Sequence, residues 1–143
     1  VPCIVSWPGH FPEGEWRDQT AMCVDWLPTL AELCRFNVDD MEIDGHSIVP
    51  LINDKNAPTP HDVLHFDFTD QEWAVMQGDW KLLYNAIDVK PNDKNETIKG
   101  LFLSNIALNP SEQTDYQKQY PEKVKELQAL REAFVSSLPA KKE

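Results

Sequence analysis

The chain has few basic residues and no long apolar run. Its 13 lysines and arginines face 24 aspartates and glutamates, which gives a formal net charge of −11. A nucleic-acid-binding surface needs clustered basic side chains to contact phosphates. A membrane-spanning helix needs roughly 20 consecutive apolar residues, and no segment approaches that length. We therefore predict neither a nucleic-acid partner nor a membrane span.

Cysteine is also scarce, with three residues at positions 3, 23 and 34. None of them forms the Cys-x-x-Cys spacing that is typical of zinc sites and redox motifs. An odd number leaves at least one thiol unpaired within the chain. We predict reduced, buried cysteines that behave as small apolar side chains.

The residues that are present are those of a folded protein. Hydrophobic residues make up 41% of the 143 positions, and five tryptophans and six phenylalanines supply large apolar surfaces for a core. The polar stretch at residues 55–60 contains two prolines and is the best candidate for a boundary. We expect one part to span residues 1–57 and a second part to span residues 58–143.

The first part shows one strand pattern and one helix pattern. Residues 2–7 are mostly apolar and stop at Pro8-Gly9, which predicts a buried strand that runs into a turn. The segment VDWLPTLAELCRFN predicts a helix with Asp25 capping its start. Its apolar positions recur with helical spacing, at Leu27, Leu30, Ala31 and Cys34.

The second part changes to the two-residue period of strands. In VLHFDF, Leu64, Phe66 and Phe68 alternate with polar positions, which predicts a strand with one buried face. Residues 73–76 and 80–84 read as two strands joined by a tight turn, and LFLS reads as another. The terminal segment from Pro121 predicts a long helix with a stripe of Val124, Leu127, Leu130, Phe134 and Leu138. The expected architecture is α+β, a small antiparallel sheet packed by a carboxy-terminal helix.

The segment HDVLHFDFTD concentrates the polar residues most able to carry chemistry. His61 and His65 would share a face on a helix, but on a strand four positions separate them by about 13 Å, too far for one metal ion. We therefore expect no local metal site. His65 and Asp67 fall on one side of the predicted strand, where they either contact a ligand or form a solvated polar face.

Several short motifs occur in an order that resembles the carboxy-terminal part of the sulfatases. These are the formylglycine-dependent enzymes of the alkaline-phosphatase-like superfamily. The matching stretches are VPCIVSWPG, DWLPTL, IDGHSIVPL, GDWKL, and NPSE followed by YPEKVKEL. Asn109 departs from the pattern, because aspartate is more usual there, and the loop from Asp88 to Lys99 is longer than typical.

The resemblance implies a sulfuric ester hydrolase whose α/β catalytic domain ends within residues 1–57. It also implies calcium as the metal, a formylglycine nucleophile, and a secreted, periplasmic or lysosomal location. No cysteine here has the proline two positions later that the formylglycine motif requires. We therefore expect the catalytic and metal-binding residues to lie outside this chain, and the chain alone to be inactive.

In the resemblance, the carboxy-terminal subdomain forms a wall of the substrate pocket. On that basis His65 and Asp67 are candidate substrate contacts, with His10 and Trp73 as further candidates. Expected partners are a sulfated small molecule or glycan, and either the missing catalytic part or a second copy of the chain. Two alternatives remain: a phosphodiesterase or phosphonate hydrolase of the same superfamily, and a non-catalytic glycan-binding or interaction module.

Overall fold

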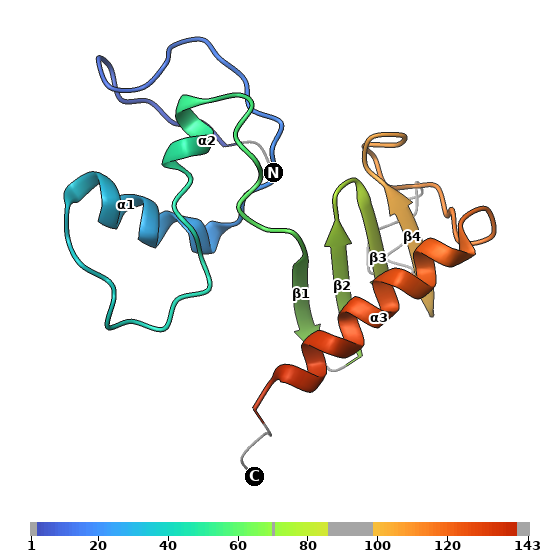
Figure 1. Cartoon of the computed structure of the whole chain (residues 1–143). Helices are drawn as coiled ribbons and strands as arrows, with labels where there is room; N and C mark the ends of the chain where they lie inside the picture. Colours follow the sequence, from blue (N-terminus) through green and yellow to red (C-terminus); the bar gives the residue numbers. More distant parts are fainter. Residues whose placement is uncertain (1–2, 70, 86–98, 140–143) are drawn as a thin grey trace. The chain divides into compact units, whose positions relative to one another are not determined.

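The computed structural model describes residues 3–69, 71–85 and 99–139. The chain divides into two compact units, Val1–His61 and Asp62–Glu143, hereafter unit 1 and unit 2. Figure 1 shows the elements of each unit. The long loop between residues 88 and 99 falls almost wholly outside the described residues.

Unit 2 is built on a four-stranded sheet in the order β1-β2-β3-β4. The strands are β1 (Leu64–Thr69), β2 (Glu72–Gln77), β3 (Trp80–Tyr84) and β4 (Leu101–Asn105). Every neighbouring pair is antiparallel. A tight turn joins β2 to β3, and Gly78 adopts a φ of +55° there, which a residue without a Cβ reaches at little cost. The predicted antiparallel sheet is confirmed.

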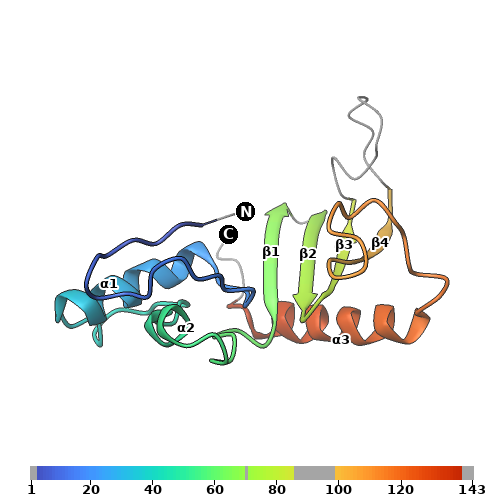
Figure 2. The same ribbon diagram turned by 90° about the horizontal axis from the view of Figure 1, so that it is seen from above.

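Helix α3 (Pro121–Ser137) lies across one face of this sheet (Figure 2). Pro121 fits the first turn, where the backbone N–H has no partner within the helix. The core joins the two layers through side chains that are almost completely buried. Its members are Val75, Leu82 and Leu103 from the sheet with Val124 and Leu127 from α3. The predicted terminal helix and the first half of its apolar stripe are confirmed.

The faces of β1 differ from the sequence prediction. His65 pairs with Val75, a core residue beneath α3, so the polar side of β1 lies on the helix-covered face. Leu64 is buried, but Phe68 is 76% exposed. The prediction that all three apolar residues of β1 would be buried is wrong for Phe68. Alternation identified the two faces, but the strand alone does not reveal which face the helix covers.

Unit 1 contains a short 3-10 helix, η1 (Cys23–Asp25), and two α-helices, α1 (Trp26–Cys34) and α2 (Val49–Asn53). The predicted amino-terminal strand is wrong for its described residues, because residues 3–7 form no strand and Ile4 is 93% exposed. An apolar strand of the parallel type is stable only between hydrogen-bonded neighbours. The described part of unit 1 contains no strand that pairs with it.

Helix α1 forms where predicted, but of its four predicted apolar positions only Ala31 is buried. Thr29 and Ala31 are buried, whereas Leu27 is 38% and Leu30 47% exposed. The cysteines depart from the prediction in the same way, since all three are free and exposed. Apolar residues of unit 1 thus remain in contact with solvent. Among the described residues no helix combines the length and apolar character needed to cross a membrane.

Candidate functional site

Asp25 organises the polar interior of unit 1. Its side chain is fully buried, and its carboxylate accepts hydrogen bonds from three donors on separate segments. These are the backbone N–H groups of Met22 at 2.7 Å and His46 at 2.9 Å, and Nε2 of His61 at 2.7 Å. Asp25 stands at the N-cap position of α1, as predicted, but its side chain makes no cap hydrogen bond to that helix. It instead joins the start of α1 to the segments around His46 and His61.

The charge of Asp25 is maintained by these hydrogen bonds. Burial alone would raise the pKa of the carboxyl group, because the ionised form loses its hydration. The hydrogen bonds from His46, Met22 and His61 outweigh burial and hold the pKa of Asp25 below its ordinary value of 3.8. The imidazole rings of His46 and His61 lie side by side, with centroids 5.2 Å apart. The result is a buried carboxylate beside two histidines.

Two neighbouring residues fix the geometry around Asp25. A Cβ on Gly45 would lie 2.1 Å from the carbonyl oxygen of Val24, so only glycine permits this approach of the backbone to η1. Thr29 donates its hydroxyl to the Asp25 carbonyl at 2.6 Å and accepts from the Ile48 N–H at 3.0 Å. The DGHSI stretch is therefore packed against the start of α1 through glycine and two polar side chains.

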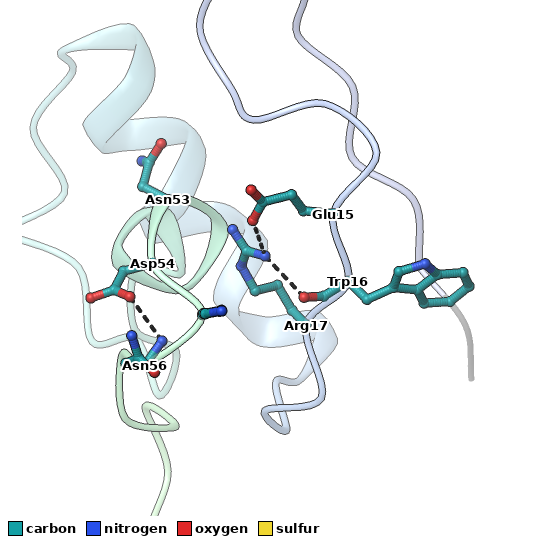
Figure 3. A pocket seen from close by; sticks show the side chains of 7 residues that line it. Glu15, Trp16, Arg17, Asn53, Asp54 and Asn56 are labelled. Atoms are coloured by element: carbon teal, nitrogen blue, oxygen red, sulfur yellow. Dashed lines mark hydrogen bonds and ion pairs between the residues drawn. The ribbon is translucent and has the colours of Figure 1, made fainter.

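An open pocket of about 440 Å³ lies elsewhere in unit 1, between residues 15–17 and residues 53–56 (Figure 3). Arg17 forms its wall and donates to the carbonyls of Leu51 and Ile52, both at 2.8 Å, at the end of α2. Arg17 also pairs with Glu15 at 2.7 Å. The indole of Trp16 points away from the other lining side chains. Because the guanidinium is occupied by protein acceptors, this arrangement primarily anchors the loop to α2.

A cluster of polar and aromatic side chains lies between β1 and α3 of unit 2. Arg131 of α3 forms a two-point ion pair with Asp67 of β1, with Nη1 2.8 Å from Oδ2. Its guanidinium also lies 5.3 Å from the ring centroid of Trp73 and 5.7 Å from that of Phe134. A bidentate carboxylate pair combined with aromatic contacts uses the planar shape of arginine, which lysine lacks. These contacts join the edge of the sheet to the helix.

His65 lies in the same cluster. Its ring stacks on Phe134 with centroids 4.0 Å apart, and its Nδ1 is buried without a hydrogen-bond partner in the described structure. Burial, assisted by the positive charge of Arg131, lowers the pKa of His65 below 6.5, against the opposing effect of Asp67. The imidazole is therefore held in its neutral form at neutral pH.

The structure brings three of the four predicted site residues together. His65, Asp67 and Trp73 meet beneath the second half of α3. His10 is an exposed residue of unit 1 and packs against Trp7, with ring centroids 4.2 Å apart. Whether these residues contact a substrate stays a prediction.

Two features of these clusters were missed from the sequence. Arg131 follows Leu127 by four positions, so helical spacing placed it on the face toward the sheet, next to the apolar stripe. The Asp25 centre had no comparable signal, because two of its three partners, His46 and His61, lie 21 and 36 residues away in the chain. Among the described residues, no group of three or more histidine, cysteine or acidic side chains is placed to hold a metal ion.

Comparison with known proteins finds similarity to sulfatases. Human arylsulfatase D is 38% identical over 65 residues, which are 45% of this chain and 11% of that protein. A solved 2-O glycosaminoglycan sulfatase matches with a TM-score of 0.54 at 18% identity, over 78% of this chain and 24% of its own. The chain is sulfatase-like in sequence and fold. No model of a known protein family matches it.

Two further solved structures support the likeness in fold. One is a Bacteroides thetaiotaomicron protein from a locus for metabolism of multiple glycosaminoglycans, with a TM-score of 0.56 and 20% identity over 77% of this chain. Another was solved with its substrate D-glucosamine-2-N,6-O-disulfate, with a TM-score of 0.54 and 20% identity over 83% of this chain. The sulfatase-like chain spans about a quarter of the length of these structures, 24% and 25%. The expected small antiparallel sheet and carboxy-terminal helix are confirmed, and the fold of the chain resembles part of these solved structures.

Proposed function

We propose that this chain is the carboxy-terminal segment of a sulfatase and serves in the hydrolysis of sulfate esters. The observation that carries the proposal is the 38% identity to human arylsulfatase D over 65 residues. The likeness in fold to solved sulfatases over most of the chain supports it. The substrate of the complete protein would be a sulfated sugar or a related sulfate ester.

The reaction would require groups supplied by residues outside this chain. A formylglycine hydrate would attack sulfur, and a divalent cation such as calcium would neutralise the sulfate oxygens. We assign no catalytic or metal-binding role to any residue of this chain, and we expect the chain alone to be inactive.

Within the complete protein, His65, Asp67 and Trp73 would contribute to a wall of the substrate pocket, and His10 of unit 1 stays a separate candidate substrate contact. The ion pair with Arg131 fixes the position of Asp67 while leaving the Asp67 side chain 42% exposed. A ligand hydroxyl could therefore approach the free surface of the carboxylate without breaking the pair. The neutral imidazole of His65 would favour an uncharged part of the ligand.

The two parts of the chain that the sequence predicts would belong to different domains of the complete protein. Residues 1–57 would be the end of the catalytic α/β domain, and residues 58–143 the carboxy-terminal subdomain. The exposed apolar side chains of unit 1, such as Ile4, Leu27 and Leu30, would pack against the catalytic part in the complete protein. Exposing apolar side chains to water is costly, and packing against the catalytic part would remove that cost.

The direct test is sulfate release from a chromogenic aryl sulfate in the presence of calcium. We would assay the 143-residue chain alone and the same chain joined to its upstream catalytic sequence. The proposal predicts activity only in the joined protein. Activity in the chain alone would contradict the assigned inactivity, and hydrolysis of an aryl phosphodiester without sulfate release would favour the phosphodiesterase alternative.

The pocket-wall role is tested in the joined protein with His65→Ala. The expected result is a raised KM with little change in kcat, because the residue would bind substrate without entering the chemistry. Thr69→Ala is the matched control, since Thr69 is an exposed residue of the same strand. Equal kinetic constants for the two variants would remove His65 from the substrate pocket.

A further inference from the structure

The two edges of the sheet in unit 2 differ in whether another segment forms hydrogen bonds to them. The outer edge of β4 is covered by residues 115–117, which follow it in sequence. The Tyr116 N–H donates to the Leu103 carbonyl at 2.9 Å, and the Asp115 carboxylate accepts from the Leu103 N–H at 3.3 Å. The Gln117 side chain donates to the Leu101 carbonyl. This edge is closed to a further strand.

Within the described residues of unit 2, the outer edge of β1 has no such cover. Strand β1 is the first strand of the sheet and pairs only with β2 (Figure 1). Over residues 3–69, 71–85 and 99–139, no backbone hydrogen bond connects β1 to any segment other than β2. Phe68, on this strand, is the most exposed large apolar residue of the described part of unit 2. Unpaired N–H and C=O groups with an exposed aromatic residue form a template for another strand.

The sequence of β1 is complementary to itself in the antiparallel direction. If two copies align with Phe66 opposite Phe66, then Leu64 lies opposite Phe68, and His65 lies opposite Asp67. Apolar residues meet apolar residues on one face, and a histidine meets a carboxylate on the other. A register shift beside Thr69 ends the regular ladder, so the pairing would be short.

We propose that β1 pairs with β1 of a second copy of this chain, across a two-fold axis near Phe66. The two four-stranded sheets then form one continuous sheet, with both α3 helices on the same face. Such an interface is isologous and closes after two copies. The proposal does not depend on sulfatase activity.

The experiment is analytical ultracentrifugation of the 143-residue chain over a wide range of concentrations. A reversible monomer–dimer equilibrium is expected. Phe68→Lys places a charge at the pairing edge, where it should raise the dimer dissociation constant by about tenfold or more. Because Phe68 is exposed, this variant should retain the fold of unit 2, which circular dichroism verifies. Leu108→Lys is the matched control, since it changes another exposed apolar residue of unit 2 and should leave the dimer intact.

Hydrogen exchange supplies a second readout that does not depend on a variant. Amides of β1 should become protected as the concentration rises, while amides of β4 should show no change. A chain that is monomeric throughout would overturn the proposal. So would association that Phe68→Lys leaves unchanged, or association that is abolished by Leu30→Lys in unit 1, because the apolar surface of that unit would then form the contact. None of these results bears on the sulfatase assay.

Discussion

Unit 1 and unit 2 are stabilised by different means. Unit 2 buries apolar side chains from three neighbouring strands against one helix. Unit 1 is organised around a buried carboxylate, while Ile4, Leu27 and Leu30 remain exposed. Apolar burial is the dominant favourable contribution to folding, so unit 2 should be the more stable unit in this chain. From this difference we predict that unit 2 folds without further protein and that unit 1 is stabilised when an apolar partner covers its exposed side chains.

The largest expected effect is the loss of a core side chain in unit 2. Leu82 is fully buried between β2 and β4, so Leu82→Ala should lower the free energy of unfolding of unit 2 by about 3 kcal/mol. Residue-resolved hydrogen exchange in β3 measures the change. The same substitution at exposed Leu30 in unit 1 should cost less than about 1 kcal/mol. An equal loss in the free energy of unfolding at the two positions would contradict the claimed difference between the units.

The second effect concerns the carboxylate that organises unit 1. Asp25→Ala leaves the N–H groups of Met22 and His46 and the ring of His61 without their acceptor. Leaving buried donors unpaired should cost unit 1 about 2 kcal/mol. Loss of exchange protection in α1, with no change in β3, is the expected readout. Exposed Asp44→Ala is the control, and an equal effect there would show that general negative charge, and not this centre, is responsible.

A smaller effect is expected where α3 meets the sheet edge. Arg131→Gln removes the ion pair with Asp67 and the contacts with Trp73 and Phe134, at a cost of about 1 kcal/mol. The loss should be confined to the second half of α3. Arg131→Lys should recover only part of it, because lysine cannot form the two-point pair. Full recovery of stability by Arg131→Lys would show that the positive charge alone, and not the two-point geometry, stabilises this contact.

Acidification should affect the two units at different pH values. His65 has a lowered pKa in the folded chain, so its contribution is present above about 6.5 and is lost as the pH falls through the lower folded pKa. The pKa of Asp25 is also lowered in the folded chain, so its contribution to stability is lost only when the pH falls below 3.8. Unfolding measured between these values should therefore show destabilisation of unit 2 through His65. The His65→Phe variant should lack this slope, and an unchanged slope would contradict the assignment.

The sequence was most informative for unit 2. The alternation in β1 to β3, the glycine turn and the stripe of α3 all identified elements correctly, because each is specified by local spacing. The side of β1 that α3 covers depends on packing between distant segments, and local spacing does not encode it. This is why Phe68 was predicted to be buried.

In unit 1 the same reasoning was less successful. Leu27, Leu30 and residues 3–7 have the pattern of buried residues, yet they are exposed in this chain. Their pattern fits the proposal that another part of the complete protein covers them. The Asp25 centre could not be predicted from local spacing, because His46 and His61 come from distant loops with no periodic pattern.

The central claim is that unit 2 folds by itself while unit 1 depends on an apolar partner. Residue-resolved hydrogen exchange tests it most directly, on the 143-residue chain and on the chain joined to the upstream catalytic sequence that we propose. The account predicts strong protection of β2, β3 and α3 in both proteins, and protection of α1 that rises sharply in the joined protein. Equal protection of α1 in the two proteins would contradict the claim.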